Sequence, residues 1–335
     1  MRATEALWQG RTVRSEGVGS VALSWEGVSA SFSVIGASSV SAILSSSLLG
    51  ATRFKVFIDG SMTTRLDVNP SAGAERHVLA AGLARETIHT IVFWYIVDPV
   101  SISWPVVSPG NVTVLLFATD GSFGPPVPTL TRRLLIIGDS ISAGNQIDEA
   151  TCAADHSGTY EAQLCSSFRA NCSTLALSGF GVYQNCCPVL DAIGPMPALV
   201  RRALPSDPSV HWDDSLFVPD AIIVHLGTND VLRFNGTAAW ITGFVDAYAQ
   251  LLVDLMAAYG SNLRLPVFCL MGPMTQQPVP WIEEAMSVGR ARGLENLHFI
   301  NLTAAVDRCN HPGYASHTLM YEQARPIIAS ALQWD

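Results

Sequence analysis

The feature that most constrains this chain is an apolar strand that runs directly into Gly-Asp-Ser. Residues 133–144 read RLLIIGDSISAG, so Ser140 stands where a strand of a parallel sheet would turn into a helix. In open α/β sheets, ligands bind beyond the carboxyl ends of the strands. A serine at such a position is either a helix N-cap or a nucleophile, and the rest of the chain has to decide between the two.

The C-terminal part of the chain alternates apolar strands with segments of helical period. The clearest helix candidate is 241–260, with apolar residues three and four positions apart. This alternation predicts an α/β fold, a three-layer αβα sandwich around a parallel sheet. Ser140, Gly179 and Asn229 each follow a strand end, so we expect them to share one crevice. The predicted strands are 134–137, 174–177, 221–226, 266–270 and 297–300.

The first 125 residues have a different pattern, with short strands separated by Gly, Pro and Asp. Phe54, Val56 and Ile58 alternate before Asp59 and Gly60, which predicts an antiparallel β-sandwich of the jelly-roll kind. Three prolines then fall within 121–132, where they stiffen the chain and, lacking a backbone N–H, cannot donate hydrogen bonds to a neighbouring strand. We therefore expect a sandwich domain at 1–125, a linker at 126–132 and the α/β domain at 133–335.

Composition and charge exclude several classes of partner. A net charge of −9 disfavours nucleic acid and anionic membranes, and the longest apolar run, 91–97, is too short to cross a bilayer. The first residues, MRATEALWQGR, lack the apolar region of a signal peptide. Asn-x-Ser/Thr sequons nevertheless start at four positions and slightly favour a secreted protein; the oligomeric state stays open. The sequons begin at Asn111, Asn171, Asn235 and Asn301.

The chain contains seven cysteines, so at least one thiol stays unpaired within the chain. Five of them fall in a short stretch after Ser140, where they are either local disulfides that pin a loop or buried thiols. The sequence has no Cys-x-x-Cys pair and no His-Glu-x-x-His, so we expect neither a metal site nor a cofactor. The five are Cys152, Cys165, Cys172, Cys186 and Cys187.

The order of the sequence motifs resembles that of the SGNH (GDSL-type) hydrolases. Gly-Asp-Ser at 138–140 is followed by Ser178-Gly179, by Gly-Thr-Asn-Asp at 227–230 and by His311-Pro312. The chain is also similar to carbohydrate esterase family two, whose members place a β-sandwich ahead of an SGNH domain. The stretches that carry this similarity are FKVFIDG, RLLIIGDSIS, LSGFGVYQN, HLGTND, VFCLMGPM and HPGYASHTLM.

The resemblance implies a role for each motif residue. Ser140 would be the nucleophile, and its backbone amide, the Gly179 amide and the Asn229 side chain would form the oxyanion hole. Attack on an ester places negative charge on the carbonyl oxygen, and each preorganised donor is worth roughly 10²- to 10³-fold in rate. Gly181 is the alternative to Gly179 as a donor.

A serine hydroxyl needs a neighbouring base, and the resemblance implies that His311 is that base. His317 is its competitor, although its place near the start of the last helix fits packing better. His225 lies on a buried strand and is expected to be a core residue.

The third member of the triad departs from the family pattern. Arg308 stands three residues before His311 and Cys309 stands two before, at the positions where family members hold an Asp. Asp307 is four before and could reach round a turn, or a backbone carbonyl could orient His311.

Three functions are compatible with these residues. The first is a metal-independent serine esterase that removes small acyl groups, foremost acetyl, from a glycan or another small hydroxylated molecule. The second keeps the machinery but acts on lipid esters or acyl thioesters. The third is a catalytically weak glycan-binding or adhesion protein in which the sandwich does the binding.

Overall fold

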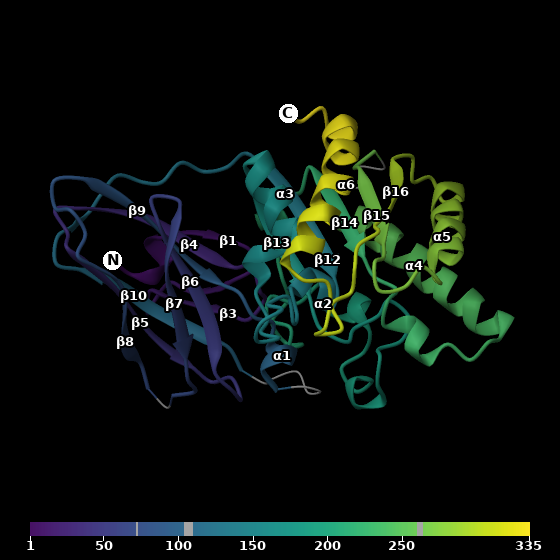
Figure 1. The fold of residues 1–335 in the computed structure, drawn as a ribbon, viewed down its shortest axis with the longest axis horizontal. Helices are drawn as coiled ribbons and strands as arrows, with labels where there is room; N and C mark the ends of the chain where they lie inside the picture. The colour runs from purple at the N-terminus through teal and green to yellow at the C-terminus, as the bar shows by residue number, and fades with distance from the viewer. Residues whose placement is uncertain (72, 104–109, 260–263) are drawn as a thin grey trace. The chain divides into compact units, whose positions relative to one another are not determined.

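The computed structural model describes residues 1–71, 73–103, 110–259 and 264–335 (Figure 1). The chain forms two compact units. The first comprises Met1–Leu130 and Arg202–His211, and the second comprises Thr131–Arg201 and Trp212–Asp335.

Two antiparallel sheets make up the first unit. One sheet has the order β1-β4-β9-β6-β7, with β11 also paired to β4, and the other has the order β2-β3-β10-β5-β8. The strands of the first sheet are β1 (Leu7–Gln9), β4 (Ser29–Ile35), β9 (Ile88–Tyr95), β6 (Thr52–Ile58), β7 (Ser61–Val68) and β11 (Ser122–Phe123). Those of the second are β2 (Val13–Ser15), β3 (Ser20–Leu23), β10 (Val112–Thr119), β5 (Ser39–Ser46) and β8 (Glu75–Ala81). The short helices η1 (Ala3–Glu5) and α1 (Pro99–Ser103) complete this unit.

Aromatic side chains between the two sheets form the core of this unit. Phe117 of β10 lies 4.5 Å, ring centroid to ring centroid, from Phe32 of β4 and 6.1 Å from Phe93 of β9. Along β6, Phe54 and Val56 are buried while Lys55 between them is not, as period-two alternation requires. The predicted sandwich is therefore confirmed.

The segment Arg202–His211 belongs to the first unit although it follows much of the second in sequence. The carbonyl oxygen of Arg202 accepts hydrogen bonds from the Arg11 guanidinium at 2.9 Å and from the Trp25 indole at 3.3 Å. Both donors are fully buried side chains that need an acceptor, and this carbonyl supplies one. The sequence predicts one domain over 133–335, and no periodicity in it marks this segment as part of the other unit.

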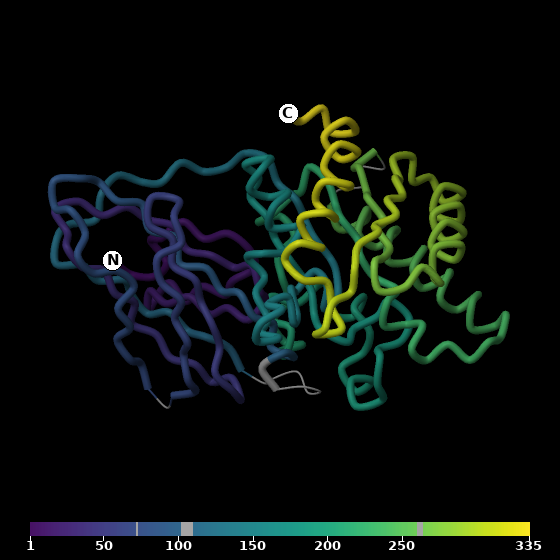
Figure 2. The backbone as a smooth tube through the Cα atoms, viewed as in Figure 1, coloured from purple at the N-terminus to yellow at the C-terminus, as the bar shows by residue number. Residues whose placement is uncertain are grey.

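A five-stranded parallel sheet forms the centre of the second unit, with the order β13-β12-β14-β15-β16. All five predicted strands are present, each within a few residues of its predicted bounds, and β12 begins inside the expected linker. The strands are β12 (Arg132–Gly138), β13 (Ala170–Ala176), β14 (Ala221–His225), β15 (Val267–Met271) and β16 (Leu297–Asn301). The backbone trace of this unit runs from teal to yellow in Figure 2.

Helices cover both faces of this sheet, which confirms the predicted three-layer α/β class. Side chains of α3 and α6 share one core cluster with Leu134 and Ile136 of β12, and the two helices lie side by side (Figure 1). The neighbouring residues Leu135 and Ile137 are equally buried and point to the other face, because successive strand residues alternate. The α-helices are α2 (Ser140–Ala143), α3 (Tyr160–Phe168), α4 (Ala238–Ala258), α5 (Val279–Ala291) and α6 (Tyr314–Leu332). The short helices are η2 (His156–Gly158), η3 (Pro188–Leu190), η4 (Met196–Ala198), η5 (Asp214–Leu216) and η6 (Asp230–Arg233).

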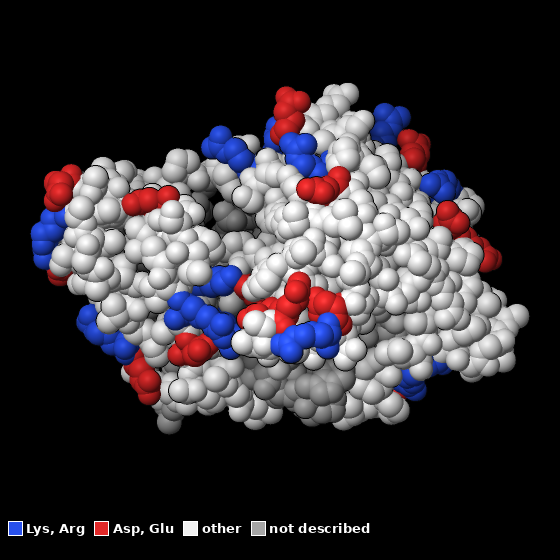
Figure 3. All heavy atoms as spheres, viewed as in Figure 1, with Lys and Arg blue, Asp and Glu red and all other residues white. Residues whose placement is uncertain are grey.

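Helix α4 corresponds to the predicted helix 241–260, of which Gly260 lies outside the described residues. Within the described part of the chain, α4 alone has the length and apolarity of a membrane span, which are properties that the core helices of folded domains share. Its buried side chains, among them Phe244, Tyr248 and Leu252, recur at helical spacing, and it packs against α5. On the face of each unit drawn in Figure 3, acidic and basic side chains are interspersed.

Four of the seven cysteines form two disulfides. Cys152 pairs with Cys309 across 157 residues, and Cys165 pairs with Cys172 across seven. Cys186, Cys187 and Cys269 are free thiols. Of the five cysteines after Ser140, Cys165 and Cys172 thus form a local disulfide, Cys152 forms a long-range one, and Cys186 and Cys187 are partly buried thiols.

Replacing both Cys152 and Cys309 by serine should lower the free energy of unfolding by about 5 kcal/mol, whereas the same change at Cys165 and Cys172 should cost about 2–3 kcal/mol. The reason is that a cross-link removes more entropy from the unfolded chain when it closes a longer loop. Urea unfolding of the two double variants under non-reducing conditions measures both values. A larger loss for the short-loop pair would contradict this explanation.

Candidate active site

Three neighbouring strands end at the same edge of the parallel sheet. β12 lies between β13 and β14, and its last residue, Gly138, is in register with Ala176 of β13 and His225 of β14. Ser140, Gly179 and Asn229 follow these three strand ends within four residues, and all three are buried. The register of the sheet therefore positions the three loops beside one another.

Ser140 is the first residue of α2, and the preceding residue supplies the helix cap. The Asp139 side chain accepts the backbone N–H of Ile141 at 3.0 Å, and Gly144, with a φ of 71°, ends the helix one turn later. The capping role considered for Ser140 thus falls to Asp139. Burial raises the pKa of Asp139 to about 7.

The Ser140 hydroxyl contacts a histidine from the far end of the chain. His311 lies in the loop between β16 and α6, and its Nε2 is 2.9 Å from Ser140 Oγ. Burial lowers the pKa of His311, while the backbone carbonyl of Cys309 and the negative charge of Asp307 act in the opposite direction. A neutral imidazole next to a serine hydroxyl is the arrangement that general-base catalysis requires.

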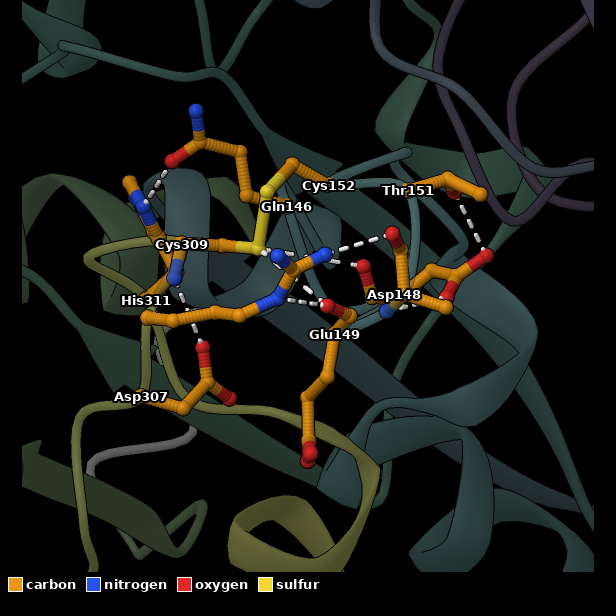
Figure 4. The surroundings of a disulfide bond; sticks show 10 residues. Gln146, Asp148, Glu149, Thr151, Cys152, Asp307, Cys309 and His311 are labelled. Atoms are coloured by element: carbon orange, nitrogen blue, oxygen red, sulfur yellow. Dashed lines mark hydrogen bonds between the residues drawn. A yellow bond between two sulfur atoms is a disulfide. The ribbon is translucent and has the colours of Figure 1, made fainter.

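The other ring nitrogen of His311 has a partner that the sequence did not reveal. Its Nδ1 lies 2.8 Å from Oε1 of Gln146, which is 165 residues away in sequence (Figure 4). Asp307, the expected third member, instead accepts the backbone N–H of Cys309 at 3.1 Å with its Oδ1. The four-residue spacing to His311 thus closes a turn and does not bring this carboxylate onto the ring.

The loop after β13 is held by one buried carboxylate. Asp230 accepts the backbone N–H groups of Val182 at 3.0 Å, Tyr183 at 2.7 Å and Gln184 at 2.9 Å. Burial raises the pKa of Asp230 to about 6, and these three amides oppose that effect. Because Asp230 directly follows Asn229, these hydrogen bonds connect the loop that carries Asn229 to the loop that carries Gly179.

Two glycines in this loop have different tasks. Gly179 has a φ of 87°, a conformation that favours glycine, and its carbonyl accepts the Cys186 N–H at 2.8 Å. The Gly181 N–H is engaged with Asn185 Oδ1 at 3.3 Å. This occupied amide favours Gly179 over Gly181 as a donor to a ligand.

The Asn229 side chain is hydrogen-bonded to the loop after β13. Its Nδ2 donates to the carbonyl oxygen of Phe180 at 2.9 Å. An amide nitrogen carries two hydrogens, so this bond orients the group and leaves a second donor.

The two other candidate histidines are satisfied core residues. His225 Nε2 lies 2.7 Å from the Gly272 carbonyl, and its Nδ1 lies 2.8 Å from the Tyr160 hydroxyl. His317 Nδ1 accepts the Tyr160 backbone N–H at 3.1 Å. Burial lowers the pKa of both rings, to about 4 for His225 and about 3 for His317. Across the described ranges, the structure contains no group of three or more His, Cys, Asp or Glu side chains that could hold a metal ion.

Replacing Asp230 by asparagine should lower the free energy of unfolding by about 1–3 kcal/mol. The amide would turn an N–H₂ group toward a backbone N–H and leave buried donors unpaired. The matched control is Asp191→Asn, because Asp191 forms an exposed ion pair with Arg233 at 2.7 Å and such pairs contribute about 1 kcal/mol or less. Thermal and urea unfolding compare the two variants, and equal losses would argue against this role for Asp230.

Comparison with known proteins places the chain in a family. The family described as GDSL-like Lipase/Acylhydrolase matches residues 134–312, which is more than half of the chain. The chain is 27% identical over 316 residues to the cellulase/esterase CelE of Acetivibrio thermocellus. That match covers 85% of this chain but 35% of CelE, so the chain spans about a third of the length of this relative.

Solved structures share the fold over nearly the whole chain. A family two carbohydrate esterase from Clostridium thermocellum, in complex with cellohexaose, superposes with a TM-score of 0.86 at 24% identity and covers 98% of this chain and 100% of its own. The acetyl xylan esterase Est2A from Butyrivibrio proteoclasticus superposes with a TM-score of 0.86 at 18% identity and covers 100% and 98%. The chain therefore belongs to the GDSL-like lipase/acylhydrolase family of hydrolases, and its fold is that of the family two carbohydrate esterases.

Proposed function

We propose that the chain is a serine esterase that removes small acyl groups, foremost acetyl, from carbohydrate or similar hydroxylated substrates. The observation that carries this proposal is the 2.9 Å contact between Ser140 Oγ and His311 Nε2 at the carboxyl edge of the parallel sheet. Membership of an acylhydrolase family supports the reaction type. One protein with the same fold has been solved in complex with cellohexaose, and a second is described as an acetyl xylan esterase. Both support a carbohydrate ester as the substrate class.

The reaction begins when Ser140 Oγ attacks the ester carbonyl while His311 Nε2 takes up the hydroxyl proton. The carbonyl oxygen becomes an oxyanion and receives hydrogen bonds from the backbone amides of Ser140 and Gly179 and from the Asn229 side chain. Collapse of this intermediate breaks the ester C–O bond, and protonated His311 donates its proton to the departing sugar oxygen, which leaves as a hydroxyl group. The acyl group stays on Ser140.

Water completes the cycle. His311 removes a proton from a water molecule, the resulting nucleophile attacks the acyl-serine carbonyl, and the same three donors stabilise the second oxyanion. Expulsion of Ser140 Oγ, which regains a proton from His311, releases the free acid. Each step uses groups that lie at the ends of β12, β13 and β14 or in the loop before α6.

Hydrolysis of p-nitrophenyl acetate, butyrate and octanoate by the wild type and Ser140→Ala tests the proposal. We expect the wild type to prefer acetate, and Ser140→Ala to lose at least about 10³-fold in kcat because no other side chain replaces the nucleophile. A preference for octanoate would point to lipid esters instead. Equal slow rates for both proteins would overturn the esterase function and favour a glycan-binding protein.

Replacing Asn229 by alanine should lower kcat by about 10²- to 10³-fold and change KM little, because the lost donor acts mainly on the oxyanion. The control variant is Asn235→Ala, since Asn235 follows η6, the next helix after Asn229, and is exposed. Steady-state kinetics on p-nitrophenyl acetate separates the two parameters. A rise in KM at constant kcat would assign Asn229 to ground-state binding.

The pH dependence of kcat/KM follows from the burial of His311. Its pKa is lowered from the usual 6.5, so the neutral form of the ring persists to lower pH. On the acidic limb of the pH profile, kcat/KM should therefore fall to half of its maximum below pH 6.5. Replacing Asp307 by asparagine removes a charge that favours the protonated ring, so the limb should move to still lower pH. We expect far less than the roughly 10⁴-fold loss that removal of a triad aspartate causes. An acidic limb above pH 7, or a loss near 10⁴-fold, would restore Asp307 as the third member.

A further inference from the structure

Gln146 adopts a backbone conformation that non-glycine residues rarely take. It follows two residues after Gly144, which ends α2, and its φ is 55°, in the left-handed region. Such a conformation persists only where the surrounding structure holds it, and it often marks a functional position. At Gln146 the conformation coincides with a side chain directed at His311, 2.8 Å from Nδ1 (Figure 4).

We propose that Gln146 is the positioning residue of His311 and acts as an uncharged third member behind the Ser140–His311 pair. This inference rests on the proposed function, because it assigns a role relative to the catalytic base. The carboxamide oxygen can only accept a hydrogen bond, so the proton of the neutral imidazole resides on Nδ1. Nε2 then presents its lone pair to the Ser140 hydroxyl, which is the tautomer that a base needs.

Cross-links join the loop that carries Gln146 to the loop that carries His311. The Cys152–Cys309 disulfide connects them directly, six residues after Gln146 and two before His311 (Figure 4). The Arg308 guanidinium donates to the backbone carbonyls of Glu149 and Ala150. Both bridges fix the distance between the two loops, so the two side chains meet in a preorganised contact.

The nearby carboxylates are directed elsewhere. Asp307 accepts the Cys309 N–H in its own turn with Oδ1. Its Oδ2 and the Glu149 carboxylate both lie beside Gly313, close to where a Cβ at that position would stand. On α6, His317 interacts electrostatically with His311, and burial, which lowers its pKa to about 3, keeps it uncharged at neutral pH. Gln146 Oε1 is therefore the side-chain acceptor for Nδ1, and like the backbone carbonyl of Cys309, which also acts on this ring, it contributes no formal charge.

A neutral partner has a consequence that distinguishes it from an aspartate. A carboxylate at Nδ1 stabilises imidazolium strongly and raises the pKa of the base, whereas a carboxamide orients the ring with a much smaller electrostatic effect. The expected result is an esterase whose base stays unprotonated in mildly acidic solution. Replacing Gln146 by glutamate introduces the missing charge at the same distance.

Gln146→Gly and Gln146→Glu together test the inference, with Ser140→Ala and Asp307→Asn as references. Glycine accepts the left-handed conformation without strain, so a loss in this variant reports on the side chain and not on the backbone. We expect Gln146→Gly to lower kcat/KM by about 10- to 100-fold at unchanged Tm. Gln146→Glu should retain activity at pH 8 and move the acidic limb upward by about one pH unit or more.

Nitrogen-15 NMR of the histidine side chains provides a readout that does not depend on activity. In the wild type His311 should be the Nδ1–H tautomer, and in Gln146→Gly the ring should become a mixture of tautomers. The inference is overturned if Gln146→Gly stays within twofold of the wild type, if the acidic limb of Gln146→Glu does not move, or if His311 carries its proton on Nε2. Inactivity of the wild type itself would refute the proposed function, while the NMR result would still report on the Gln146 contact.

Discussion

The pairing of β12 with a parallel strand on each side is the constraint on which the rest of the second unit depends. Parallel strands held in register must end at the same edge, so the loops after β12, β13 and β14 emerge together. The apolar residues of these strands are fully buried, which makes the register costly to change. Buried carboxylates then fix the loops locally: Asp139 caps α2, and Asp230 binds three amides of the neighbouring loop.

The histidine reaches this edge by a different route. It lies in a loop after β16, which β14 and β15 separate from β12 in the sheet, and no strand register specifies its distance from Ser140. Tertiary cross-links supply that specification, namely the Cys152–Cys309 disulfide and the hydrogen bonds of Arg308. The nucleophile thus depends on sheet packing, whereas the base depends on links between loops.

Much of the fold could be predicted from the sequence, because periodicity reports directly on burial. The alternation in β6 and the apolar runs of the parallel strands are local signals, and both sheet classes followed from them. The placement of Arg202–His211 with the first unit could not be predicted, since it depends on a backbone carbonyl that satisfies Arg11 and Trp25. No sequence pattern encodes such a contact.

The residues of the candidate site likewise divide into those that local sequence signals indicate and one that only a tertiary contact reveals. Ser140, Gly179 and Asn229 could be predicted to lie together because each follows a strand end, and the His-Pro motif before the last helix indicates His311 as the base. The partner of Nδ1 could not be found in this way, since Gln146 is 165 residues from His311 and glutamine is not a usual triad member. The one local hint is that its position requires a left-handed backbone, which is visible only in the folded chain.

Reaction of the folded protein with a serine-directed fluorophosphonate tests whether Ser140 is the activated nucleophile. If the His311 imidazole activates the Ser140 hydroxyl as the 2.9 Å contact implies, intact-mass spectrometry should show one adduct per chain, and peptide mapping should place it on Ser140. Replacing His311 by alanine should slow the labelling strongly. An unlabelled protein, or an adduct on another serine such as Ser142 or Ser178, would contradict the account.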